Sequence, residues 1–138
     1  MNASILYVED DIHNRLLVRR ILEAQGYIFL EADTGQLGLT MITQDIPDIA
    51  MIDINLPDID GYEIVSQIRQ NADLAQLPLI AITGNVLQGD REKALAAGFD
   101  LYLAKPIDVD ALPRHIAHIL KSKVPTQASP SQTGNYPA

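Results

Sequence analysis

The sequence of 138 residues contains no cysteine, which excludes disulfide bonds and thiolate metal sites. Its beginning, MNASILYVEDD, lacks a basic flank and a long apolar stretch, so it is neither a signal peptide nor a membrane span. Basic residues are few: 10 lysines and arginines stand against 18 acidic residues, a formal charge of -8. Because this charge repels phosphate backbones and anionic lipids, we expect a cytoplasmic protein that binds neither nucleic acid nor membrane.

Short apolar runs alternate with longer helical patterns along the chain. The runs lack polar alternation, which is typical of strands covered on both faces. They cover residues 5–8, 28–30, 49–52, 79–82 and 101–103. Gly26 and Gly98 stand where two of the intervening helices should end. Five strand–helix units with right-handed crossovers predict an α/β fold, a three-layer doubly wound sandwich around a parallel five-stranded sheet.

The end of the chain changes in composition. The last helical pattern should begin near Asp110, because Pro113 then lies in the first turn, where proline does little harm. The stretch from residue 122 onward is rich in proline, serine, threonine and glutamine. This composition is typical of disorder. We therefore expect one folded domain at residues 1–121 and a disordered tail at residues 122–138.

Polar residues follow four of the five predicted strands. The carboxyl ends of parallel strands meet at one edge of a sheet, and functional sites of such folds lie there. The residues delivered to this edge are Glu9, Asp10 and Asp11 after the first strand, Asp53 and Asn55 after the third, Thr83 and Gly84 after the fourth, and Lys105 and Pro106 after the fifth. Acids, one hydroxyl and one lysine should therefore converge.

This set of side chains suits phosphoryl chemistry. Crowded carboxylates repel one another unless a hard cation lies between them, so Glu9, Asp10 and Asp53 predict a site for magnesium, or for manganese. Such an ion also binds phosphoryl oxygens, and a carboxylate can attack phosphorus to give an aspartyl phosphate. Thr83 and Lys105 would then receive the phosphoryl oxygens. Taken singly, each residue also has an ordinary structural role, and Asp11 in particular is suited to cap a helix.

Two other classes of protein place an aspartate or a phosphate at this edge. A haloacid-dehalogenase-like phosphatase needs a second aspartate two residues after the nucleophile as a general acid, and Asn55 stands there. A flavodoxin-like cofactor binder needs a glycine- or hydroxyl-rich loop after the first strand, where this chain has three acids that would repel a phosphate. Both classes are therefore disfavoured.

Four motifs carry a resemblance to a known family. VEDD at residues 8–11, DINLPDIDG at 53–61, TG at 83–84 and YLAKP at 102–106 occur in the order and spacing of the receiver domains of two-component response regulators. The chain resembles that family over residues 4–121, and most of all its single-domain regulators and the receivers of hybrid histidine kinases. The resemblance implies the flavodoxin-like strand order 2-1-3-4-5.

The resemblance also implies a function. Asp53 would accept a phosphoryl group from a histidine kinase or a histidine phosphotransfer protein. No enzymatic activity is expected beyond self-catalysed phosphorylation and dephosphorylation. Because only the tail follows the last helix, we expect no output domain, and the signal would pass to another protein. A degenerate receiver that serves only as an interaction module remains an alternative.

Particular residues acquire roles by the same resemblance. It implies magnesium held by the side chains of Glu9, Asp10 and Asp53 and by the backbone carbonyl of Asn55. Glu9 departs from the aspartate that is more frequent in the family, which lengthens the arm toward the metal and keeps its charge.

A switch is implied as well. Thr83 and Lys105 would contact the phosphoryl group, and Tyr102 matches the aromatic switch position. Its ring should rotate inward when the hydroxyl of Thr83 moves toward the phosphoryl oxygens. The face of the fourth helix and fifth strand, around residues 86–105, would then present a changed surface to a downstream protein. The Lys105-Pro106 peptide bond is expected to be cis.

Overall fold

A computed structural model describes residues 2–84 and 89–123. In this part of the chain, strands and helices alternate in the order β1 (Ser4–Val8), α1 (Ile12–Ala24), β2 (Ile28–Ala32), α2 (Gly35–Gln44), β3 (Ile49–Asp53), α3 (Gly61–Gln70), β4 (Leu79–Thr83), α4 (Asp90–Ala97), β5 (Leu101–Ala104) and α5 (Ala111–Lys123). Every predicted strand is confirmed and is one or two residues longer than its apolar run. None of these described helices has both the length and the apolar content to cross a membrane.

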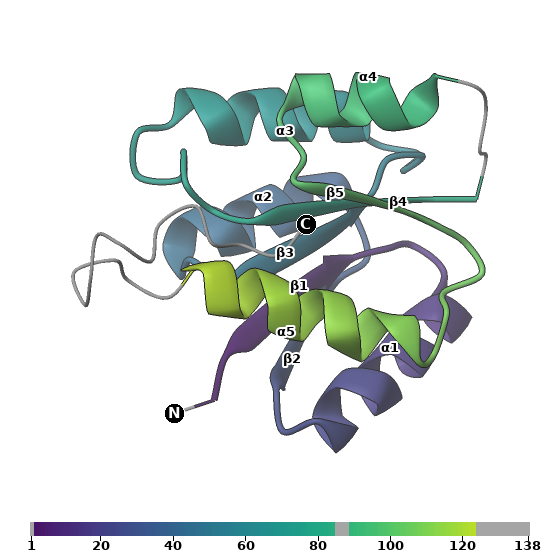
Figure 1. Ribbon diagram of the computed structural model, residues 1–138. Coiled ribbons are helices and arrows are strands. Elements are labelled where there is room, and N and C mark those ends of the chain that lie inside the picture. Colours follow the sequence, from purple (N-terminus) through teal and green to yellow (C-terminus); the bar gives the residue numbers. More distant parts are fainter. Residues whose placement is uncertain (1, 85–88, 124–138) are drawn as a thin grey trace.

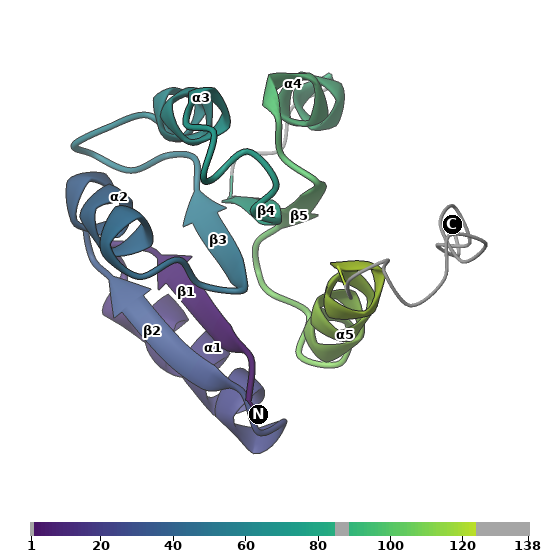
Figure 2. The same ribbon diagram turned by 90° about the vertical axis from the view of Figure 1, so that its left-hand side faces the viewer.

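The strands form one parallel sheet in the order β2-β1-β3-β4-β5, as the resemblance implied. Figures 1 and 2 show the sheet between two layers of helices, α2, α3 and α4 on one face and α1 and α5 on the other. The predicted three-layer, doubly wound sandwich is therefore confirmed.

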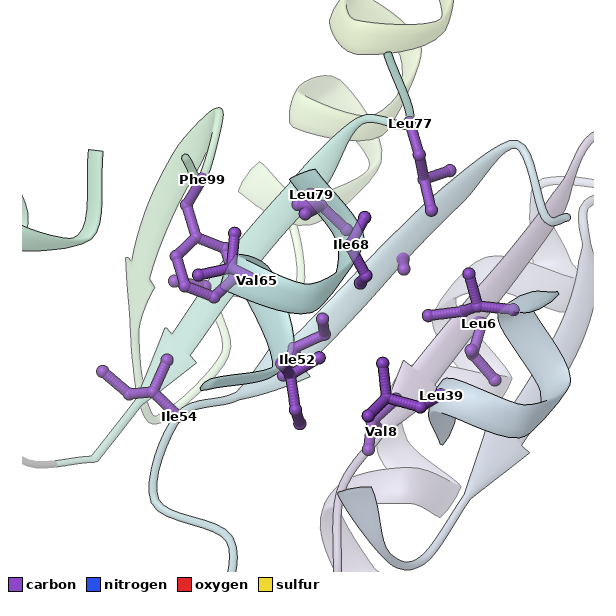
Figure 3. Packing of buried hydrophobic residues seen from close by; sticks show 14 of the residues in the cluster. Leu6, Val8, Leu39, Ile52, Ile54, Val65, Ile68, Leu77, Leu79 and Phe99 are labelled. Atoms are coloured by element: carbon purple, nitrogen blue, oxygen red, sulfur yellow. The ribbon is translucent and has the colours of Figure 1, made fainter. Parts of the chain in front are cut away.

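Each face of the sheet carries its own hydrophobic cluster. Leu6, Val8 and Ile52 point toward α2 and α3 and pack with Leu39 and Val65 (Figure 3). On the opposite face, alternate residues of the same strands pack against α1 and α5. Strands β3 and β4 are buried along their whole length.

The prediction that all strands are covered on both faces is wrong for the two edges of the sheet. Ile28 of β2 is 48% exposed, and only one residue of the edge strand β5, Tyr102, is buried. An edge strand has a neighbouring strand on one side only, so its side chains are less completely covered.

Local signals account for the ends of the helices. Asp11, Thr34 and Asp60 cap the N-termini of α1, α2 and α3 with side-chain oxygens that accept backbone N–H groups. Gly26 and Gly98 have φ angles of 87° and 123° after α1 and α4, so both predicted glycine stops are confirmed.

The last helix differs from prediction at its far end. Asp108 accepts hydrogen bonds from the backbone N–H groups of Asp110 and Ala111, and the helix begins at Ala111, close to the predicted start. It continues to Lys123, two residues past the boundary predicted at residue 121, because composition does not reveal where a helical hydrogen-bond ladder stops. The remainder of the predicted tail, residues 124–138, lies outside the described residues.

A close backbone approach shapes the loop that follows β3. The N–H of Gly61 donates to the carbonyl of Ile54 at 3.2 Å, so the start of α3 rests on the end of β3. A Cβ atom on Gly61 would lie 2.5 Å from the Cα atom of Ile54. Only glycine fits there without moving the backbone.

We therefore predict that Gly61→Ala lowers the free energy of unfolding by about 1–3 kcal/mol, because the added methyl group overpacks this contact. Gly84→Ala is the matched control, since its Cβ would lie 3.6 Å from Cδ of Lys105, an ordinary contact. We expect a change within about 0.5 kcal/mol for the control. Urea denaturation measures both, and equal effects would contradict the prediction.

Candidate functional site

The ends of the strands are held in register beyond the strands themselves. The N–H of Glu9 donates to the carbonyl of Ala32 at 2.9 Å. The N–H of Lys105 donates to the carbonyl of Thr83 at 2.7 Å. Backbone hydrogen bonds of the sheet therefore set the positions from which the predicted side chains project.

Three predicted acids form one cluster at the carboxyl edge. Glu9, Asp10 and Asp53 each place a carboxylate oxygen within 4.8 Å of the others. Glu9 and Asp53 are buried, and Asp10 is exposed. Asp11 does not join them, because its side chain accepts the N–H of His13 at 2.8 Å as the cap of α1. Asp11 therefore has the structural role of a helix cap.

The Lys105 ammonium lies between two of these carboxylates. Its Nζ is 2.7 Å from Oε1 of Glu9 and 2.9 Å from Oδ2 of Asp53. Lys105 lies 52 positions along the chain from Asp53, so this contact joins distant segments. The peptide bond from Lys105 to Pro106 is cis, as expected.

A tyrosine that sequence reasoning missed also belongs to the cluster. The buried hydroxyl of Tyr7 donates to Oε1 of Glu9 at 2.8 Å. The N–H of Asp11 donates to the other oxygen, Oε2, at 3.1 Å. A signal was present in the sequence, because residues two apart along a strand share a face and a buried tyrosine hydroxyl needs a partner.

The carboxyl groups of the cluster are electrostatically unequal. Burial alone would raise the pKa of Glu9, but hydrogen bonds from Lys105, Asp11 and Tyr7 outweigh it and hold that pKa below its usual value. Burial raises the pKa of Asp53 despite hydrogen bonds from the Asn55 N–H and from Lys105. Desolvation and the adjacent Glu9 carboxylate raise the pKa of Asp10.

Lys105 remains charged within the cluster. Burial lowers its pKa, but the hydrogen bonds to Glu9 and Asp53 outweigh burial and raise it. One ammonium thus faces three carboxylates. Two of these carboxylates have raised pKa values, so their charged forms disfavour the folded state increasingly as pH rises through those values. A divalent cation would relieve this repulsion, and the oxygen ligands fit magnesium.

Asn55 and Thr83 are joined by their side chains. Nδ2 of Asn55 donates to Oγ1 of Thr83 at 2.9 Å, and Thr83 is buried. The backbone N–H of Asn55 also donates to Oδ1 of Asp53 at 2.9 Å. The structure therefore brings every predicted site residue except Tyr102 into or beside the acidic cluster.

Tyr102 instead lies in the core cluster between the sheet and helices α2, α3 and α4, and it is 7% exposed. Its ring therefore lies inward, and the expected rotation of this ring on phosphorylation stays a prediction. Burying an aromatic ring is favourable by itself. Within residues 2–84 and 89–123, its hydroxyl is the one buried side-chain polar atom without a hydrogen-bond partner.

This structure has the architecture of a signalling receiver: a parallel sheet in the order 2-1-3-4-5, with clustered acids, a threonine and a lysine at its carboxyl edge. The chain belongs to the response regulator receiver domain family, which it matches over residues 5–117. It is 34% identical over 119 residues to the polar-differentiation response regulator DivK of Brucella ovis, an alignment that covers 86% of this chain and 94% of DivK.

Solved structures agree with this assignment. A CheY-like response regulator receiver domain protein from Methanospirillum hungatei JF-1 is 29% identical with a TM-score of 0.82, over 89% of this chain and 97% of that one. The receiver domain of a sensor histidine kinase from Pseudomonas aeruginosa PAO1 is 33% identical with a TM-score of 0.80, over 88% and 99%. The latter has a magnesium ion coordinated in its active site cleft.

We predict that magnesium stabilises the protein through the acidic cluster. At about one hundred times the dissociation constant, binding adds about 2.7 kcal/mol to the free energy of unfolding, which raises Tm by several degrees. Asp10→Asn should lose much of this increase, whereas Asp73→Asn, an exposed acid outside the cluster, should keep it. Thermal melting with and without magnesium measures the effect. An unchanged Tm together with unchanged amide shifts at residues 9, 10 and 53 would contradict the prediction.

Proposed function

We propose that this receiver domain is the phosphoacceptor of a two-component or phosphorelay system, and that Asp53 takes the phosphoryl group from a histidine kinase or a histidine phosphotransfer protein. One observation carries the proposal: the Asp53 carboxylate, at the end of β3, contacts Lys105 and the N–H of Asn55 and lies beside two further acids. The protein would act in the cytoplasm and pass the signal on by protein–protein contact.

The proposed step is an in-line displacement at phosphorus. A carboxylate oxygen of Asp53 forms the new O–P bond while the P–N bond of the donor phosphohistidine breaks, and its electron pair returns to the imidazole nitrogen. Lys105, whose Nζ lies 2.9 Å from Oδ2 of Asp53, would donate hydrogen bonds to the incoming phosphoryl oxygens and offset their charge. The hydroxyl of Thr83 would donate a hydrogen bond to one of them.

Magnesium would be held by the side chains of Glu9, Asp10 and Asp53 and by the backbone carbonyl of Asn55, and manganese would suit the same oxygen ligands. When bound, the ion would neutralise charge on the phosphoryl oxygens. Burial and the nearby Glu9 carboxylate raise the pKa values of Asp10 and Asp53, and a cation beside them would favour their charged forms. The magnesium in the Pseudomonas aeruginosa receiver supports this role independently.

An enzymatic alternative is disfavoured by a specific contact. In a phosphatase, the residue two positions after the nucleophile would protonate the leaving group. Here that residue is Asn55, and its amide is engaged with Thr83 as a hydrogen-bond donor. We therefore propose no activity beyond self-catalysed phosphorylation and dephosphorylation of Asp53. Because Asp53, Thr83 and Lys105 are all present at the site, a degenerate receiver is disfavoured too.

With magnesium and acetyl phosphate, the protein should gain one phosphoryl group, detected as a mass increase in the intact protein. Asp53→Asn should gain none, and Asp45→Asn, an exposed acid at the end of α2, should behave as wild type. Lys105→Ala should slow the reaction by roughly tenfold to a hundredfold, the equivalent of one charged hydrogen bond. A phosphoryl group gained equally by Asp53→Asn would refute the assignment.

We also propose that Thr83 links the phosphoryl group to the face formed by α4 and β5, where a downstream protein would bind. Phosphoryl oxygens beside Thr83 would draw its hydroxyl and rearrange its contact with Asn55. Thr83 pairs in the sheet with Ala104 of β5, the strand that carries Tyr102 two residues earlier. A movement of Thr83 would therefore be felt directly by β5. Phosphorylation would shift the balance between two pre-existing arrangements of this face toward the one that holds the phosphoryl group better.

Beryllofluoride, which mimics the phosphoryl group, tests this link by NMR. In wild type, amide shifts should change at Asp53 and also across α4 and β5. In Thr83→Ala the changes should stay near Asp53, because the connecting hydroxyl is absent. Of the predicted surface at residues 86–105, residues 86–88 lie outside the described residues, so the comparison rests on residues 89–105. Changes confined to the surroundings of Asp53 in wild type would show that the coupling does not exist.

A further inference from the structure

Tyr7 stands out among the buried side chains because its polar group is used at the site and not in the core. The residue has no solvent exposure, and its ring belongs to the cluster between the sheet and helices α1 and α5. Its hydroxyl emerges from this apolar layer and donates to Oε1 of Glu9 at 2.8 Å. A buried hydroxyl without an acceptor would be costly, so ring packing and the hydrogen bond depend on each other.

The contact requires a glutamate at position 9. Tyr7 and Glu9 are two residues apart and project from the same side of β1, so the long side chain of Glu9 can fold back over the end of the tyrosine ring. An aspartate would be shorter by one carbon–carbon bond, about 1.5 Å. Its carboxylate would lose the hydroxyl from hydrogen-bond range unless the backbone moved.

Three donors together define the orientation of the Glu9 carboxylate. Oε1 accepts from the Tyr7 hydroxyl and from Nζ of Lys105, and Oε2 accepts from the N–H of Asp11. Nζ of Lys105 is also engaged with Asp53. The Tyr7 hydroxyl is the uncharged donor to Oε1, the oxygen that Glu9 shares with Lys105.

From this geometry we infer that Tyr7 is a positioning residue for the divalent cation: its hydroxyl holds the Glu9 carboxylate in the orientation that faces Asp10 and Asp53. The inference rests on the proposed function, in which these three acids hold magnesium. The Tyr7 and Glu9 pair would position a carboxylate for the cation. The shorter aspartate, which is more frequent in the family at this position, would do so without a tyrosine. Residues that orient a metal ligand in this way typically change metal affinity by about tenfold to a hundredfold when removed.

Tyr7→Phe tests the inference, since it removes the hydroxyl and keeps the ring. The dissociation constant for magnesium, measured by calorimetry on the unphosphorylated full-length protein, should rise by about tenfold. Tyr27→Phe is the matched control, because Tyr27 packs against the same hydrophobic cluster, and its dissociation constant should equal that of wild type. The amide shift of Asp11, whose N–H contacts Glu9, should change in Tyr7→Phe without magnesium and stay unchanged in the control.

A double-mutant cycle separates positioning from a general loss of stability. In a Glu9→Asp background the Tyr7 hydroxyl has no carboxylate within reach, so adding Tyr7→Phe should change the magnesium dissociation constant by less than about twofold. A structural role alone predicts the same change in both backgrounds. Glu9→Asp by itself keeps the Tyr7 ring in the core and should also weaken binding, which provides a second test if Tyr7→Phe folds poorly.

The outcomes are distinguishable. Wild-type affinity in Tyr7→Phe, or equal weakening with Glu9 and with Asp at position 9, would overturn the inference and leave the proposed function intact. No magnesium binding by the wild-type protein would instead overturn the metal site of the proposed function, and the inference with it.

Discussion

The shared ammonium of Lys105 is the contact on which the site depends. It lies 2.7 Å from Glu9 and 2.9 Å from Asp53, and so it joins residues that come from the ends of three different strands. This is possible only because β3 lies between β1 and β4 in the sheet, which makes Glu9 and Asp53 neighbours, and because β5 follows β4 on the same side. A strand inserted between β1 and β3 would separate the two acids. The layered packing of helices on both faces therefore serves to keep these strand ends adjacent (Figure 2).

The positive charge of Lys105 does not balance the negative charges of the three carboxylates near it. The three carboxylates also differ in how well their charge is stabilised. Glu9 is fully buried yet well supplied with donors, so it retains its charge at little cost. For Asp10 and Asp53, burial and the Glu9 carboxylate outweigh the favourable contacts, and their pKa values are raised. The folded protein thus contains unfavourable negative charge at one edge of the sheet. Burial of apolar side chains in the two hydrophobic clusters offsets its free-energy cost. Under the proposed function, a divalent cation at these oxygens would relieve the unfavourable charge.

The contacts around Asn55 and Tyr102 connect the site to the rest of the molecule. Asn55 holds Asp53 by its backbone and Thr83 by its side chain, so the acceptor and the hydroxyl that would sense the phosphoryl group share one partner. Tyr102 is already packed inward beneath the α2, α3 and α4 layer. Under the proposed function, a phosphoryl group would shift an equilibrium between existing arrangements of these contacts.

Sequence alone determined the class of fold and most of the site. Apolar runs without polar alternation identify strands inside a sheet, and parallel strands bring the residues after them to one edge, so the convergence of Asp53, Thr83 and Lys105 follows from local pattern and topology. The tertiary structure alone decided which side chains touch. Tyr7 reaching Glu9 and the inward ring of Tyr102 depend on rotamers and packing between distant segments, which periodicity does not record. The exposed edges of the sheet also became visible only there, because coverage of a strand depends on its neighbours in space and not on its own residues.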